Sequence, residues 1–158
     1  MINRTEIIVI GGCAGNGLAS FRREKYVPFG GPDGGDGGNG GDVFIAADFS
    51  LVDLALLKQK RRFRAESGHQ GGRWGKHGKR GENINILVPV GTMVFIRAET
   101  GEEKLLGDLI ALEQKVLVAK GGKGGLGNVH FATGANQAPR VAAKGELGEE
   151  RRVVLELK

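Results

Sequence analysis

The fold is decided by the stretch Gly30-Gly31-Pro32-Asp33-Gly34-Gly35-Asp36-Gly37-Gly38-Asn39-Gly40-Gly41, in which glycine returns at every third position. One row of glycines with this spacing is Gly31, Gly34, Gly37 and Gly40, and a second is Gly35, Gly38 and Gly41. A period of three belongs neither to the α-helix nor to the β-strand, whereas polyproline II turns once in about three residues. The stretch therefore predicts an extended polyproline II segment with glycine on two of its faces, against which other backbones can pack.

The same spacing returns elsewhere in the chain. Of its 158 residues 29 are glycine, and 23 of these lie in four clusters, at residues 11–17, 30–41, 68–81 and 121–127. Further rows with a spacing of three are Gly72, Gly75, Gly78 and Gly81, and Gly121, Gly124 and Gly127. A single glycine-rich stretch would favour a flexible linker, but four clusters in phase between strand-like segments favour a packed bundle. Collagen is excluded because the runs are short and the chain has only 4 prolines.

Between the clusters the chain has short runs rich in Val, Ile and Phe, which predict β-strands. They lie at residues 5–10, 42–47, 83–89, 92–97, 115–120 and 151–157. A short helix is predicted at residues 50–58, with Ser50 as its cap and Asp53 at the capping-box position. No longer amphipathic helix is predicted, so we expect one mainly β domain over residues 1–158, a sandwich or barrel from which the glycine-rich segments project.

The net charge of +5 is concentrated in one part of the chain. Residues 58–80 carry nine basic side chains and one acidic one, so the rest of the chain is net negative. If residues 72–81 form polyproline II, one edge carries Arg73, Lys76 and Lys79, and another carries Trp74, His77 and Arg80. Phosphates favour the first edge and unstacked bases the second, so the pattern favours nucleic-acid binding. The alternative is a solvated loop whose Trp74 folds onto the β body.

Motifs for catalysis and cofactor binding are weak. Two segments match G-x-G-x-x-G, at residues 35–40 and 122–127, but neither leads into a helix that could receive a pyrophosphate. No G-x-x-x-x-G-K-[ST] is present, and the three histidines lack metal-ligand spacing, so no metal site is predicted. Asp33, Asp36 and Asp42 lack the terminal Glu of a calcium loop. We expect them to accept hydrogen bonds from backbone N–H groups or to pair with basic residues.

The compartment can be inferred from cysteine content and hydropathy. The single cysteine, Cys13, excludes an internal disulfide and favours a reducing compartment. No apolar run approaches the roughly 20 residues of a membrane span, and the first residues lack the pattern of a signal peptide. We therefore expect a soluble, cytoplasmic protein.

A series of motifs runs through nearly the whole chain. It includes Phe21-Arg22-Arg23-Glu24-Lys25-Tyr26-Val27-Pro28, Asp33-Gly34-Gly35-Asp36-Gly37-Gly38, Gly121-Gly122-Lys123-Gly124-Gly125-Leu126-Gly127-Asn128, Gln137-Ala138-Pro139-Arg140 and Leu155-Glu156-Leu157-Lys158. This ordered set resembles the N-terminal domain of the Obg family of ribosome-associated GTPases. The resemblance implies the Obg fold: an eight-stranded β-barrel or sandwich that bears six glycine-rich polyproline II helices. It also implies a GTPase domain after Lys158, which would use GTP and magnesium.

The resemblance further implies that the projecting tips enter the large ribosomal subunit near the peptidyl-transferase centre, in subunit assembly and stress control. The tips would lie at residues 25–32, 73–80 and 130–140. We therefore expect a non-catalytic domain that docks on ribosomal RNA. The residues expected to neutralise phosphates are Arg22, Arg23, Lys25, Arg73, Lys76, Lys79, Arg80 and Arg140, and those expected to stack on bases are Trp74 and His77. Two alternatives are a dinucleotide-binding enzyme and a purely structural polyproline II bundle.

Overall fold

The computed structural model describes residues 3–22, 30–111 and 114–157. Its strands are β1 (Arg4–Ile10), β2 (Val43–Asp48), β3 (Arg62–Arg64), β4 (Ile84–Pro89), β5 (Thr92–Arg97), β6 (Glu103–Leu109), β7 (Lys115–Ala119) and β8 (Glu150–Leu157). The helices are α1 (Leu56–Gln59) and the 3₁₀-helix η1 (Asn128–Phe131). The six strands predicted from the sequence are confirmed, with ends that differ by at most one residue.

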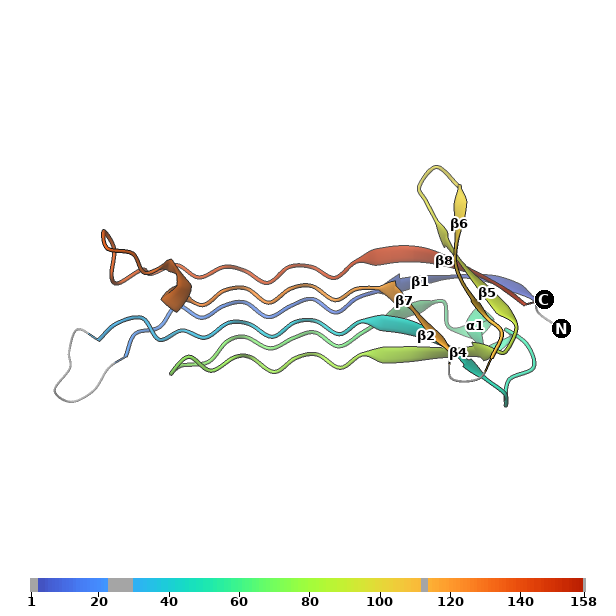
Figure 1. The fold of residues 1–158 in the computed structure, drawn as a ribbon, viewed down its shortest axis with the longest axis horizontal. Coiled ribbons are helices and arrows are strands. Elements are labelled where there is room, and N and C mark those ends of the chain that lie inside the picture. The colour runs from blue at the N-terminus through green and yellow to red at the C-terminus, as the bar shows by residue number, and fades with distance from the viewer. Residues whose placement is uncertain (1–2, 23–29, 112–113, 158) are drawn as a thin grey trace.

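The strands form two sheets at one end of the molecule (Figure 1). The larger sheet has the order β3-β1-β8-β5-β6, and the smaller has the order β4-β2-β7. The sequence predicts a sandwich or a barrel. Among the described residues no strand pair joins the two sheets, so the barrel alternative is wrong and the β body is a sandwich. Within the described part of the chain the edge strands β3 and β6 each pair on one side only, which leaves the larger sheet open.

The core lies between the two sheets and follows from the alternation of side chains along each strand. Ile7 and Val9 point inward from β1 of the larger sheet, and Ile45 does so from β2 of the smaller one. Leu54 and Leu57 complete the core from the turn before α1 and from α1 itself. All five side chains are buried.

The helix predicted at residues 50–58 is wrong in its extent and in its cap. Ser50 donates from both N and Oγ to Asp48 Oδ1, at 2.9 and 3.0 Å, and Asp53 Oδ1 accepts the N–H of Ala55. Such local side-chain bonds stabilise turns in competition with a helix. In this part of the chain helical structure is therefore confined to Leu56–Gln59, and Ala55 at its N-cap makes no side-chain hydrogen bond.

Two strands lie outside the sequence prediction. β3 reads Arg-Phe-Arg, and its outer residues are exposed; β6 reads Glu-Lys-Leu-Leu-Gly-Asp-Leu, and its first four residues are exposed. The first four residues of β6 lack the alternation of a half-buried strand, and the alternation of β3 covers only three residues, too few to predict a strand. Both are strands because they pair, β3 in parallel with β1 and β6 antiparallel with β5.

Beyond the sheets the glycine-rich segments run side by side as a long projection, here called the glycine bundle (Figure 1). It consists of residues 11–18, 34–41, 65–72, 76–83, 120–127 and 143–149. Backbone hydrogen bonds join neighbouring segments at every third residue; for example, Gly12, Gly15 and Leu18 donate to Gly41, Gly38 and Gly35, at 2.9, 2.9 and 3.0 Å. A β-ladder would instead have a period of two. The period of the sequence is therefore the period of the backbone contacts.

The bundle is narrow because glycine faces backbone. At 22 of the 29 glycines an added Cβ would lie closer than 3.0 Å to a backbone atom elsewhere in the chain. The row Gly34, Gly37 and Gly40 faces residues 12–18, and the row Gly121, Gly124 and Gly127 faces residues 34–41. Among the described residues, close packing does not explain Gly31 and Gly75, where an added Cβ would meet nothing within 4 Å, or Gly72, where it would meet Lys76 alone.

Polar side chains of the central segment also hold its neighbour. Asp36, Asn39 and Asp42 accept hydrogen bonds from the N–H groups of Gly127, Gly124 and Gly121, at 2.8, 2.8 and 2.7 Å. The prediction that Asp36 and Asp42 accept bonds from backbone N–H groups is confirmed, and Asn39 shares this role. The spacing of three thus directs side-chain hydrogen-bond acceptors, as well as glycines, toward the neighbouring segments of the bundle.

An ion-pair network on the outer face of the larger sheet predicts a pH dependence of stability. Arg97 lies 2.6 Å from Glu6 and 2.9 Å from Glu103, and Arg4 also pairs with Glu103. The hydrogen bond from Arg97, more than any other cause, holds the pKa of Glu103 below its ordinary value. A carboxylate with a lowered pKa stabilises the fold at neutral pH, and this contribution disappears as the pH falls through the folded-state pKa.

We therefore expect Glu103→Gln to lower the melting temperature slightly at neutral pH, because exposed ion pairs contribute little. The difference from the parent should vanish well below pH ~4.3, the ordinary Glu value. Thermal melts of both proteins, followed by circular dichroism at neutral pH and again at a pH well below ~4.3, would test this. An equal difference at both pH values would contradict it.

Candidate nucleic-acid interface

The end of the glycine bundle far from the sheets carries much of the predicted nucleic-acid site (Figure 1). Three parts of the chain lie there: the turn at residues 73–75, residues 20–22 with 30–33, and η1 with the loop that follows it. They come from distant parts of the sequence, and the bundle segments beneath them bring them together.

The turn at residues 73–75 corrects the expectation of an uninterrupted rod over residues 72–81. Trp74 and Gly75 have positive φ values, 62° and 69°, and the chain reverses there. Asp33 holds the turn: its Oδ2 accepts the N–H of Trp74 at 3.2 Å, and its carbonyl accepts the N–H of Gly75 at 2.7 Å. Gly75 is thus explained by its conformation, since glycine adopts positive φ without strain. Arg73 and Trp74 sit on the turn, while Lys76, His77, Lys79 and Arg80 follow it on the returning segment.

Trp74 is 58% exposed, at the far end from the β body, so the alternative in which it folds onto that body is wrong. The Arg22 guanidinium lies 5.9 Å from the centroid of the indole ring, within the range of a cation–π contact. The two side chains line a shallow pocket of about 430 Å³ together with Gly31, Pro32, Asp33, Gly75 and Val129. An exposed indole beside a guanidinium is the arrangement on which an unpaired base can stack.

Asn128 is the residue that sequence reasoning missed at this end. It is fully buried, and its Nδ2 donates to the carbonyls of Ser20 and Pro139, at 2.9 and 3.0 Å. Its Oδ1 accepts the N–H of Gly34 at 2.9 Å. One amide therefore ties together three of the segments that converge at the tip. The feature of the sequence that could have indicated Asn128 is its position directly after the glycine row Gly121, Gly124 and Gly127.

Two histidines, His77 and His130, lie on either side of Asp36, close to the tip of the bundle. His130 Nε2 lies 2.9 Å from Asp36 Oδ1, and His77 Nδ1 lies 3.7 Å from Asp36 Oδ2. His77 is exposed, so it can both pair with Asp36 and meet a ligand. In the part of the chain that the structure describes, no three or more His, Cys, Asp or Glu residues are grouped so that they could hold a metal ion.

The other predicted contact residues are distributed along the bundle. Arg22, Arg73, Lys76, Lys79 and Arg140 are exposed. Arg80 is also exposed but lies toward the sheets, where its Nη2 is 3.4 Å from Asp42 Oδ2. Arg23 and Lys25 lie outside the described residues, as does most of the predicted tip at residues 25–32.

The basic stretch of residues 58–80 is divided in space. Its first basic residues lie beside the sheets, on α1, on β3 and between them: Lys58, Lys60, Arg61, Arg62 and Arg64. Of the remaining four, Arg73 lies on the turn at the tip, and Lys76, Lys79 and Arg80 lie on the bundle. The continuous stretch in the sequence therefore forms two separate basic surfaces.

The fold and the site define a mainly β domain whose glycine bundle ends in a basic and aromatic tip. The GTP1/OBG family model matches residues 2–158, and the chain belongs to this family, as its N-terminal Obg domain. It is 55% identical over 157 residues to the GTPase Obg of Sulfurihydrogenibium sp. (strain YO3AOP1), covering 99% of this chain and 44% of that protein. It is 54% identical to the GTPase Obg of Persephonella marina, covering 99% of this chain and 45% of that protein.

A third relative, the GTPase Obg of Desulforamulus reducens, is 53% identical over 156 residues, covering 99% of this chain and 36% of that protein. The chain thus spans less than half the length of these curated relatives. No helix among the described residues is long and apolar enough to cross a membrane.

Proposed function

We propose that this domain docks on ribosomal RNA of the large subunit and takes no catalytic part itself. The observation that carries the proposal is the exposed Trp74 beside Arg22, at the end of a long, narrow projection. Because Trp74 stays largely exposed, its burial contributes little to the stability of the folded domain. A base stacked on it would contribute about 1–3 kcal/mol to binding. Arg73 and Lys76 lie within two residues of Trp74 in the chain, and both side chains are exposed, so they can bind phosphates.

We infer that the six segments of the bundle are polyproline II helices. The glycine period of three and the hydrogen bonds at every third residue support this inference. Such segments are thinner than an α-helix with its side chains, which is about 10 Å or more across. Packed together they make a stiff rod that can enter a narrow space in folded RNA and carry the tip to bases that a broader domain cannot reach.

We further propose that in the full-length protein a GTPase domain acts together with this domain in subunit assembly and stress control. The relatives' name, GTPase Obg, supports the pairing. These 158 residues do not themselves fit GTP and magnesium, because the phosphate-binding G-x-x-x-x-G-K-[ST] is missing from them. The nucleotide would therefore be held elsewhere in the full-length protein. We propose a docking site near the peptidyl-transferase centre, which is the location that the family resemblance implies.

The dinucleotide-binding alternative is disfavoured by the packing of its two glycine motifs. Gly35, Gly37 and Gly40 face neighbouring backbones and lead into β2, while residues 122–127 lead only into the four-residue η1. Neither motif has the free glycines and the long helix that hold a pyrophosphate. A purely structural bundle would not need an exposed Trp74 between basic side chains.

The proposal is tested by measuring how these 158 residues bind purified large ribosomal subunits at increasing salt. We expect log K to fall linearly with log[salt], with a slope near −0.7 to −0.9 for each phosphate neutralised. Small subunits provide the matched control. Binding that is indifferent to salt, or equal for the two subunits, would overturn the proposal.

A further inference from the structure

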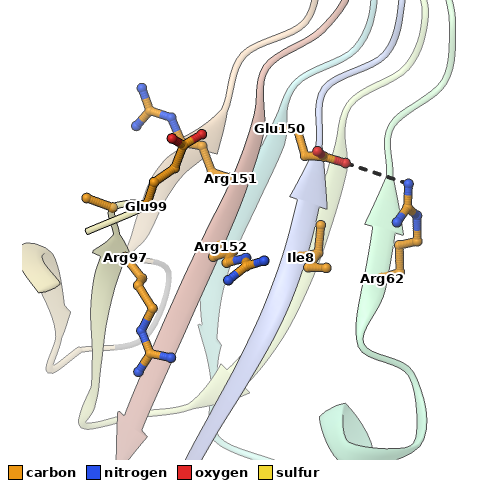
Figure 2. A pocket seen from close by; sticks show the side chains of 8 residues that line it. Ile8, Arg62, Arg97, Glu99, Glu150, Arg151 and Arg152 are labelled. Atoms are coloured by element: carbon orange, nitrogen blue, oxygen red, sulfur yellow. Dashed lines mark ion pairs between the residues drawn. The ribbon is translucent and has the colours of Figure 1, made fainter. Parts of the chain in front are cut away.

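A second basic site lies at the sheets, away from the tip. It is a pocket of about 590 Å³ on the outer face of the larger sheet, beside the start of the bundle (Figure 2). Its lining includes the four arginines Arg62, Arg97, Arg151 and Arg152. Ile8 and Ala98 supply apolar surface, and Glu99 and Glu150 supply negative charge.

Strand pairing places three of these arginines in one row. Ile8 of β1 lies opposite Arg62 of β3 on one side and opposite Arg152 of β8 on the other. Arg152 in turn lies opposite Arg97 of β5. Like charges directly opposite each other on neighbouring strands destabilise a sheet. Arg152 and Arg97 are such a pair, so their repulsion costs the fold stability unless anions neutralise it, whereas Ile8 separates Arg62 from Arg152.

The acidic residues of the chain neutralise this row only in part. Arg97 pairs with Glu6 and Glu103, and Arg151 pairs with Glu149 at 2.8 Å. Arg62 has only an exposed contact of 3.6 Å with Glu150. Arg152, between Arg62 and Arg97 in the row, makes no ion pair or hydrogen bond with any side chain that the structure describes.

A buried donor in the row is also unsatisfied. Arg97 Nε has no hydrogen-bond partner among the described residues, although both terminal nitrogens of the same guanidinium are paired. Buried donors in native structures usually have a partner, so an unpaired one calls for an explanation. Arg152 therefore contributes unused hydrogen-bond donors and positive charge to the pocket lining, and Arg97 Nε is a further unpaired donor in the same row of arginines.

We propose that this pocket binds a small ligand with two or more phosphate groups. Guanidinium groups bind phosphate in a bidentate manner, and the pocket volume is in the range of small-molecule sites. Strands are about 4.8 Å apart, so the row from Arg62 to Arg97 spans roughly 14 Å at the backbone. A single phosphate would reach one part of the row, whereas linked phosphates can meet Arg152 and a neighbouring arginine together. The site is independent of RNA docking at the tip.

Isothermal titration with tripolyphosphate, pyrophosphate and orthophosphate tests the proposal. We expect affinity to rise with the number of linked phosphates and Arg152→Ala to weaken tripolyphosphate binding at least tenfold. Arg152→Lys should recover only part of it, because an ammonium cannot form the bidentate contact. Arg64→Ala is the matched control, since Arg64 is an exposed arginine of β3 outside the pocket lining, and it should leave binding unchanged.

Several results would overturn the proposal. They are the absence of tripolyphosphate binding at millimolar concentration, equal affinity for the three anions, and equal weakening by Arg64→Ala and Arg152→Ala. A loss of large-subunit binding in Arg152→Ala as great as its loss of tripolyphosphate binding would assign the pocket to the RNA backbone instead. If Arg152→Ala lowers the melting temperature, Arg62→Ala is the test variant used instead. Arg62 is exposed on an edge strand, so its loss should disturb the fold less.

Discussion

Replacing Gly37 by alanine is expected to lower the free energy of unfolding by about 3 kcal/mol, the upper end of the usual range for overpacked sites. An added Cβ would collide with the carbonyl group of Gly15, which belongs to the neighbouring segment. The obstacle is backbone, so no side chain can turn away to make room. Gly15 cannot shift without disturbing the hydrogen bonds that its N–H and carbonyl make to Gly38 and Gly125, at 2.9 and 3.0 Å. Urea unfolding at equilibrium would measure the change.

Gly31→Ala is the matched control, because Gly31 belongs to the same row of glycines but an added Cβ there would lie within 4 Å of no described atom. Its φ is not in the left-handed region, so alanine brings no strain there. Alanine also reduces the entropy of the unfolded chain, which stabilises a compatible site by about 0.4–1 kcal/mol. A Gly37→Ala variant that melts at or above the parent temperature would show that the segments are not packed this closely.

Replacing Arg73, Lys76, Lys79 and Arg80 together by alanine is expected to weaken binding to large ribosomal subunits by about a hundredfold at low salt. Each lost phosphate contact should make the salt slope shallower by about 0.7–0.9, so the four together should change it by about 3. All four side chains are exposed, so we expect the melting temperature to change little. Filter binding or sedimentation with purified subunits over a salt series would measure both quantities.

The control removes the same charge from the other basic surface, by changing Lys58, Lys60, Arg61 and Arg64 to alanine. The net charge then falls equally, and an equal loss of binding would mean that total charge rather than the tip governs docking. Trp74→Ala separates stacking from charge: it should weaken binding by about 1–3 kcal/mol and leave the salt slope unchanged.

Much of the fold could be predicted because the sequence has two periodic patterns, apolar residues at every second position and glycines at every third. Alternation of apolar residues located strands such as β1 and β5, since a half-buried strand must bury every second side chain. The glycine rows located the bundle, since only glycine lets backbones approach so closely. β3 and β6 were not predicted because β3 alternates over only three residues and most of β6 is exposed; their pairing with β1 and β5 makes them strands.

The candidate site was predicted in its residue types but not in its arrangement. Arg73 and Trp74 were recognised as a basic and aromatic pair, but the turn that presents them depends on Asp33, some 40 residues earlier in the chain. Asn128 was missed because a buried amide is recognisable only by its partners, Ser20, Gly34 and Pro139. Long-range partners leave no local signal in a single sequence.

By itself the sequence determined which segments are extended, which faces must be glycine, and that basic residues accompany the only tryptophan. Only the tertiary structure decided which segments are neighbours, that the described strands form two sheets without closing into a barrel, and that one basic stretch becomes two surfaces. The physical reason is that period and composition act within a few residues of chain. Neighbourhood in the bundle and register in the sheets are set by backbone hydrogen bonds between distant segments, and these same bonds place Arg62, Arg152 and Arg97 in one row.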